Sequence, residues 1–174
     1  MTRQNGRISG IIVLMKKQDK TNVMRLLDAA KISYEPHFYK ADPTMSGEEI
    51  AGLLGERPER VFKTLVTRGK SGGFYVFVVP VAAELNLKKA AKAAGEKAVS
   101  MIKQKELLPL TGYVHGGCSP IGMKKHFPTW IHETATGEDV HIFVSAGKVG
   151  AQIELDPQDL IRIAGCQVAD LIIS

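Results

Sequence analysis

Apolar and polar positions recur with a helical period in several segments of the chain. Apolar residues three or four positions apart predict a helix over Asp19 to Lys31. Ser46 and Glu49 form a capping-box pattern, which predicts a second helix that ends before Gly55. Further helices are predicted from Asn86 to Gly95, from Ile102 to Leu108 and from Asp156 to Ala164.

Short runs of β-branched and aromatic residues predict strands. Val61 to Arg68 and Phe74 to Pro80 flank a glycine-rich connection and predict an antiparallel hairpin. Trp130 to Thr134 and Val140 to Ser145 predict a second hairpin. The remaining predicted strands are an edge strand over Tyr34 to Lys40, interrupted by Pro36, and strands over Ala151 to Leu155 and Val168 to Ile173. About six strands interleaved with helices, without strict alternation, predict an α+β fold with a mixed, mostly antiparallel, barrel-like sheet surrounded by helices.

Length and composition indicate one folded domain. The chain has 174 residues, of which 44% are hydrophobic and 24% charged, and these values exclude a disordered chain, collagen and a coiled coil. Residues 1–14 are expected to be a leader or an added segment, with Met15 as a plausible native start and residues 15–174 as the domain. The apolar run from Ile11 to Met15 is far shorter than the ~20 residues that a membrane span needs.

The two cysteines, Cys118 and Cys166, do not form a disulfide framework and predict free thiols in a reducing cytoplasm. His115 and Cys118 have a spacing seen in metal sites, but no second pair accompanies them. No metal and no cofactor are therefore predicted. Cys118 is also a candidate nucleophile beside His115, although no third group that would orient the base is evident. A small buried cysteine in a tight loop is the commoner explanation.

Positive charge is concentrated in one part of the chain. The formal net charge is +5, and the stretch from Asn86 to Lys105 holds six lysines against the single acid Glu96. A second cluster is Lys124, Lys125 and His126. A solvated helix face is the ordinary interpretation of such a run, and a surface that binds phosphate groups is the alternative.

Two further features indicate a binding site. Lys63 alternates with Val61 and Leu65 in a predicted strand and therefore shares an apolar face with them. An amine on such a face must reach solvent, pair with an acceptor or line a pocket. The glycines from Gly116 to Gly122 allow a ligand to approach backbone N–H groups, although a structural turn is the commoner role of such a loop.

Four segments together resemble the YbaK/EbsC family, in that family's order and spacing. They are Val61 to Val66, Asn86 to Ala91, Thr111 to Gly122 and Phe143 to Lys148, and the resemblance extends from about Lys20 to Ile173. It implies a mixed, barrel-like fold related to the editing domain of bacterial prolyl-tRNA synthetases. It also implies an enzyme that removes cysteine from mischarged tRNA(Pro), and from Cys-tRNA(Cys) as well, without a cofactor and in a transient complex with prolyl-tRNA synthetase in the cytoplasm.

The resemblance further implies how the reaction proceeds. The thiol of the substrate attacks its own carbonyl group, so the protein supplies orientation and electrostatic stabilisation instead of a nucleophile. Catalytic positions are then Lys63, which contacts the terminal nucleotide or its phosphate, and Gly116 and Gly117, whose loop holds the carbonyl. Substrate-binding positions are Tyr39, Thr64, Ser119, Pro120 and Ser145, and tRNA contacts are expected at Lys88, Lys89, Lys92, Lys124 and Lys125.

Three alternatives stay open at this point. The same fold can edit another amino acid, such as alanine on tRNA(Pro). The chain can also be a non-catalytic module that binds tRNA or a synthetase. Nucleophilic chemistry at Cys118 is the third alternative, and it is weakened because many relatives have an aliphatic residue at this position.

Overall fold

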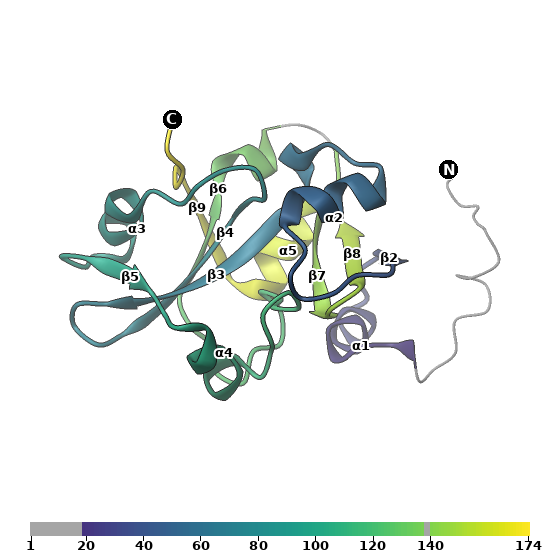
Figure 1. Cartoon of the computed structure of the whole chain (residues 1–174), viewed down its shortest axis with the longest axis horizontal. Coiled ribbons are helices and arrows are strands. Elements are labelled where there is room, and N and C mark those ends of the chain that lie inside the picture. The colour runs from purple at the N-terminus through teal and green to yellow at the C-terminus, as the bar shows by residue number, and fades with distance from the viewer. Residues whose placement is uncertain (1–18, 138–139) are drawn as a thin grey trace.

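The computed structural model describes residues 19–137 and 140–174, so the predicted leader over 1–14 lies outside the described residues. Within them, five α-helices surround eight strands that form two sheets (Figure 1). The predicted α+β class is therefore confirmed. The helices are α1 (Asn22–Ala29), α2 (Gly47–Leu54), α3 (Leu87–Ala94), α4 (Gln104–Thr111) and α5 (Pro157–Ala164).

The larger sheet has five strands in the order β5-β3-β4-β6-β9. β3 (Phe62–Gly69) and β4 (Phe74–Pro80) form the predicted antiparallel hairpin, and β6 (Thr129–His132) runs parallel to β4. β5 (Val99–Met101), which the sequence pattern did not predict, pairs antiparallel with β3. The last strand, β9 (Cys166–Ala169), begins earlier than predicted and pairs parallel with β6.

The smaller sheet has three antiparallel strands in the order β2-β8-β7. Its members are β2 (Glu35–Phe38), β7 (Ile142–Lys148) and β8 (Ala151–Leu155). β2 lies at the edge of this sheet, as Pro36 predicted, because proline cannot donate to a ladder on both sides. Four of the six strand pairings in the described residues are antiparallel, which agrees with a mixed, mostly antiparallel architecture.

The predicted hairpin over Trp130 to Thr134 and Val140 to Ser145 is wrong, because its two strands belong to different sheets. All four residues of β6 are buried, as expected of a strand that has parallel neighbours on both sides and is covered on both faces. The 3-10 helix η3 (Glu133–Thr136) begins directly after β6. β7 then joins the smaller sheet and pairs with β8.

Capping chemistry places most helices where the sequence predicts them. Ser46 accepts a hydrogen bond from the Glu49 N–H while the Glu49 carboxylate accepts one from the Ser46 N–H, so the predicted capping box is present. Gly55 ends α2 in the left-handed conformation, and Asn86 caps α3. α4 begins at Gln104, later than predicted, and includes Pro109 in its last turn.

Separate apolar cores pack on the two faces of the larger sheet. The main core lies between the sheets and includes Leu27 of α1 and Leu160 of α5, both fully buried. Ala90 of α3 packs with Phe77 and Trp130 on the other face. No helix of the described residues is both long enough and apolar enough to cross a membrane.

The two sheets meet where β3 and β7 approach each other, which we call the seam. A single parallel bridge joins Val61, just before β3, to Phe143 of β7, and the two strands remain in contact beyond it. The strands therefore adjoin at the seam without forming a continuous closed barrel among the described residues. Ala51 of α2 packs against Val61 and Phe143 and covers one end of the seam.

Candidate functional site

The register at the seam brings Lys63 next to Ser145. Val61 and Phe143 pair in parallel and point to the same side, toward α2. Because strand side chains alternate between faces, the next positions on this side are Lys63 in β3 and Ser145 in β7. The fold thus joins two residues that lie 82 positions apart in the sequence (145 minus 63).

Strand pairing in the smaller sheet extends this group. Ser145 lies opposite Gln152 of β8, and Gln152 lies opposite His37 of β2, so these three side chains share a face. The N–H of Tyr39, just beyond β2, donates to the Gly150 carbonyl at 3.0 Å. Burial raises the pKa of the Tyr39 phenol, and the side chain of Gln152 partly opposes that shift. We call Tyr39, Lys63, Ser145 and Gln152 the seam cluster.

Lys63 is a half-buried amine with an acceptor close to it. Its Nζ donates to the Val81 carbonyl at 3.3 Å. Burial lowers the pKa of the Lys63 amine, and the carboxylates of Glu48 and Glu84 partly counteract the shift. The neighbouring same-face residue Leu65 packs against the core beneath α3. The predicted placement of Lys63 on an apolar strand face is therefore confirmed.

Two buried polar atoms near the seam have no hydrogen-bond partner in the described structure, and they are Thr64 Oγ1 and Gln152 Oε1. An unpartnered buried polar group costs about 1–3 kcal/mol, so each is a candidate contact for a ligand. Alternation places Thr64 on the opposite face of β3 from Lys63. The sequence analysis did not identify Gln152, although a glutamine between Ala151 and Ile153 in a predicted strand is a signal that could have identified it.

The glycine loop packs directly on the backbone around the seam cluster. Gly116 has a positive φ of 88°, and a Cβ built on it would lie 3.3 Å from Pro43 Cα. A Cβ on Gly117 would lie 2.9 Å from backbone atoms of Lys148, at the end of β7. The Gly117 N–H already donates to the Val114 carbonyl at 2.9 Å. Both glycines therefore permit close packing, and the Gly117 amide is engaged within its own loop.

Three side chains of this loop serve its internal packing. Ser119 is fully buried, and its Oγ accepts a hydrogen bond from the Ile121 N–H at 3.3 Å. Pro120 is buried and borders a small pocket beside α5. Burial raises the pKa of the Cys118 thiol to about 12, so the thiolate that nucleophilic attack requires is scarce at neutral pH. Substrate contacts of Ser119 and Pro120 stay predictions.

The predicted tRNA-contacting lysines lie on two separate parts of the surface. Lys88 and Lys92 are exposed on α3, whereas Lys89 Nζ donates to an Asp170 carboxylate oxygen and to the Ile172 carbonyl, both at 2.8 Å. In the other group, Lys125 is exposed, and Lys124 Nζ donates to the carbonyl of Pro109 in α4 at 3.4 Å. In the view of Figure 1, α3 and α4 lie on either side of β5.

Residues 41–163 match the model of the family described as "Aminoacyl-tRNA editing domain". The chain belongs to this family. The matched range includes Lys63, Ser145 and Gln152 of the seam cluster, and Tyr39 lies just before it. The predicted resemblance to editing proteins is therefore confirmed.

Similar proteins agree with this assignment. An Enterococcus faecalis protein named "Putative Cys-tRNA(Pro)/Cys-tRNA(Cys) deacylase EbsC" is 46% identical over 157 residues, which cover 90% of this chain and 95% of that protein. A solved structure described as "a putative trans-editing enzyme for prolyl tRNA synthetase" matches with a TM-score of 0.73 and 25% identity, covering 87% of this chain and 97% of that one. Another, described as "hypothetical protein APE2540", has a TM-score of 0.78 and 26% identity over 87% of this chain and 99% of its own.

Proposed function

We propose that this protein is a free-standing deacylase that removes cysteine from Cys-tRNA(Pro), and from Cys-tRNA(Cys) as well. The observation that carries the proposal is the seam cluster, in which a half-buried amine adjoins Ser145 within an aminoacyl-tRNA editing domain. The relative named for this activity, 46% identical over almost its whole length, supports cysteine as the amino acid.

The bond to be broken is the ester between the cysteine carboxyl group and the terminal ribose of the tRNA. The thiol of the substrate loses its proton as its sulfur attacks the ester carbonyl carbon. A carbon–sulfur bond forms, the ester carbon–oxygen bond breaks, and the ribose oxygen leaves with a proton. The products are a cyclic thiolactone and free tRNA, and water then opens the thiolactone to cysteine. The protein needs only to orient these groups and to stabilise developing negative charge.

The seam cluster supplies groups suited to that task. The Lys63 ammonium, which donates to the Val81 carbonyl, would stabilise negative charge on the terminal phosphate or on the carbonyl oxygen of the substrate. The Tyr39 phenol is protonated at neutral pH, and burial raises its pKa further, so its hydroxyl can donate a hydrogen bond. Gln152 Oε1 is a buried acceptor that has no hydrogen-bond partner among the described residues, and it would suit the ammonium group of the aminoacyl moiety. The high pKa of the Cys118 thiol favours attack by the substrate's own sulfur.

We also assign a role to the exposed lysines. Lys88, Lys92 and Lys125 would attract the tRNA backbone, while Lys89 is already paired with Asp170 and would contribute less. Such contacts carry little sequence information, so selection of tRNA(Pro) would come from a transient complex with prolyl-tRNA synthetase in the cytoplasm. The affinity for tRNA should then decrease steadily as the salt concentration rises. An affinity that does not change with salt would indicate that these lysines form a solvated surface and do not contact tRNA.

The deciding experiment compares deacylation of one tRNA(Pro) carrying cysteine, alanine or serine. Serine is the matched control because its hydroxyl replaces the thiol with little change in size. We expect cysteine to be released far faster than either of the others. Faster release of alanine would assign the protein to a different editing specificity, and equal release of serine would exclude assistance by the substrate thiol. If no amino acid is released from any of these tRNAs, the remaining hypothesis is a non-catalytic module that binds tRNA or a synthetase.

A further inference from the structure

The first turn of α2 packs against the main chain that holds the Lys63 ammonium. Gly47 is the first residue of α2, and a Cβ built on it would lie 2.6 Å from Val81 Cβ. Gly47 does not have a positive φ, so the contact with Val81, and not the backbone conformation, excludes a side chain at this position. Val81 is also the residue whose carbonyl accepts the hydrogen bond from Lys63 Nζ. One close contact therefore joins the start of α2 to the acceptor of Lys63.

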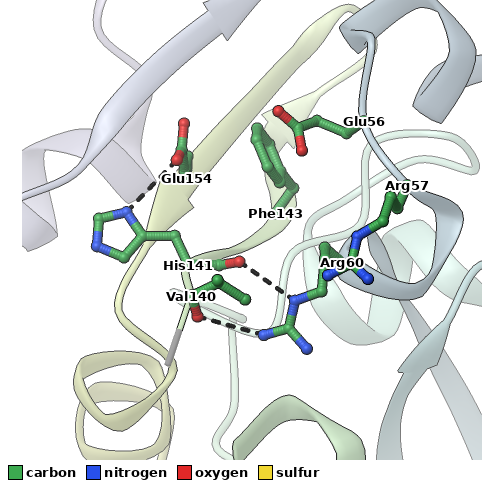
Figure 2. A pocket seen from close by; sticks show the side chains of 7 residues that line it. All are labelled: Glu56, Arg57, Arg60, Val140, His141, Phe143 and Glu154. Carbon is green, nitrogen blue, oxygen red and sulfur yellow. Dashed lines mark hydrogen bonds and ion pairs between the residues drawn. The ribbon is translucent and has the colours of Figure 1, made fainter. Parts of the chain in front are cut away.

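The chain that follows α2 is held separately. Arg60 donates to the carbonyls of His141, at 3.4 Å, and Val140, at 3.3 Å, and Figure 2 shows these bonds beside Phe143. His141 Nδ1 in turn lies 3.5 Å from Glu154 Oε2. The helix is therefore anchored on both sides, by its first residue at the seam and by the segment after it at the chain that leads into β7.

Two carboxylates from different elements interact with the Lys63 ammonium. Glu48 directly follows Gly47 in the first turn of α2, and Glu84 lies in the segment between β4 and α3. Burial lowers the pKa of the Lys63 amine, and both carboxylates counteract part of that shift. The backbone at Glu84 is fixed, because its carbonyl accepts the Ile173 N–H at 3.0 Å. Both carboxylates therefore favour the charged form of an amine that burial disfavours.

The other elements around Lys63 contribute neutral or paired groups. Ser145 of β7 is uncharged, and the Tyr39 phenol beyond β2 is protonated at neutral pH. On the side of α3, the Lys89 ammonium is paired with the Asp170 carboxylate at 2.8 Å. The charge on Lys63 therefore depends chiefly on the carboxylates from α2 and from the segment after β4.

We propose that Glu48 is a positioning residue for deacylation, and that its carboxylate keeps the Lys63 ammonium charged and in place at the seam cluster. Gly47 permits the close approach of α2 on which this arrangement depends, and Glu84 makes a second, smaller contribution. The dipole of α2 favours negative charge in the first turn of the helix, where Glu48 lies. The inference rests on the role in deacylation that we propose for Lys63, and it does not depend on which amino acid is edited.

The first test measures the charge on Lys63 without substrate. Full-length protein labelled with carbon-13 at the lysine ε-carbons is titrated between pH 7 and pH 10 by NMR, and the signal absent from Lys63→Met identifies Lys63. In Glu48→Gln we expect the ratio of charged to neutral Lys63 to fall by about 1.5- to 5-fold at a given pH, because Glu48 is exposed and water screens its charge. Glu59→Gln removes another exposed carboxylate and is the matched control, so its Lys63 curve should equal that of the wild type.

The second test is single-turnover deacylation of Cys-tRNA(Pro) at pH 7 and pH 9.5, after subtraction of uncatalysed hydrolysis. Relative to the wild type, the rate of Glu48→Gln should fall as pH rises, whereas a merely structural defect would slow the reaction by the same factor at both values. Glu48→Asp retains the charge and should restore most of the wild-type profile.

The two tests separate this inference from the function on which it rests. Circular dichroism first confirms that each variant is folded. An unchanged Lys63 titration curve in Glu48→Gln would overturn the inference itself. A shifted curve without a matching change in the deacylation rate would instead overturn the catalytic role of Lys63, and the positioning role of Glu48 with it.

Discussion

Replacing Lys63 by methionine isolates the contribution of one charge at the seam. The substitution removes the ammonium and keeps an unbranched apolar chain on the strand face that Lys63 shares with Val61 and Leu65. The lost hydrogen bond from the Lys63 ammonium to the Val81 carbonyl is long, at 3.3 Å, so we expect it to contribute no more than the lower end of the about 1.5–3 kcal/mol that is typical of a bond with a charged group. Burial disfavours the charged amine, as its lowered pKa indicates, and relief of that penalty offsets the loss. We therefore expect the free energy of unfolding to change by less than about 1 kcal/mol.

The effect on deacylation should be much larger. A hydrogen bond that involves a charged group contributes about 1.5–3 kcal/mol, and each 1.36 kcal/mol of lost transition-state stabilisation slows a reaction about tenfold. Lys63→Met should therefore reduce the rate of Cys-tRNA(Pro) deacylation by about 10- to 150-fold. Because we assign most of the attraction for tRNA to the exposed lysines, we expect the affinity for tRNA to remain largely unchanged.

Single-turnover deacylation measures the rate constant for the bound substrate, and filter binding measures the tRNA affinity separately. Lys70→Met is the matched control, because it removes an exposed lysine from the turn between β3 and β4. That variant should deacylate at the wild-type rate. A Lys63→Met rate within twofold of the wild type would refute the catalytic role of Lys63. A slow rate that is fully explained by lost tRNA binding would refute it equally.

Three other predictions concern groups outside the seam cluster. Arg60→Met removes a buried guanidinium that donates to four main-chain carbonyl groups, and it should lower the free energy of unfolding by about 3–5 kcal/mol, measured by chemical denaturation. Burial lowers the pKa of His132, whose Nδ1 accepts the Leu171 N–H, so the unfolded chain takes up a proton first as pH falls. Stability should therefore decrease below about pH 6.5, and less steeply in His132→Asn, in melting curves recorded between pH 5 and pH 8. Cys118→Ala should retain full deacylase activity, because the thiol of Cys118, whose pKa is about 12, provides no nucleophile at neutral pH.

Elements that depend on local chemistry could be predicted from the sequence. The pairing of strands that are distant in the sequence could not. Ser46 and Asn86 cap their helices as expected, because a cap needs only residues within one turn. The sequence also predicted that β6 and β7 are strands, but it did not predict the strands with which they pair. Two neighbouring strand patterns resemble a hairpin, whereas the complete burial of β6 between β4 and β9 becomes evident only in the folded chain.

The same distinction between local pattern and long-range pairing applies to the residues of the candidate site. Lys63 was identifiable from alternation within one strand, because its neighbours Val61 and Leu65 are apolar. Tyr39 and Ser145 were indicated by the family resemblance and not by any local pattern. Gln152 and Glu154 were missed because their partners come from β2 and β7, and only the register of the smaller sheet places these side chains together.

The strand β8 gives the strongest physical reason to place function at this sheet. All five of its residues are buried, and a strand buried on both faces is usually apolar throughout. In β8 the face toward the main core is apolar, with Ile153 fully buried, but the other face carries Gln152 and Glu154. Burial of polar groups is unfavourable unless partners satisfy them, and valine or leucine would fold more stably at these positions. Glu154 is paired with His37 and His141, whereas Gln152 Oε1 has no hydrogen-bond partner among the described residues. The fold tolerates that cost on the face that adjoins Lys63, where a polar substrate would provide the missing partner.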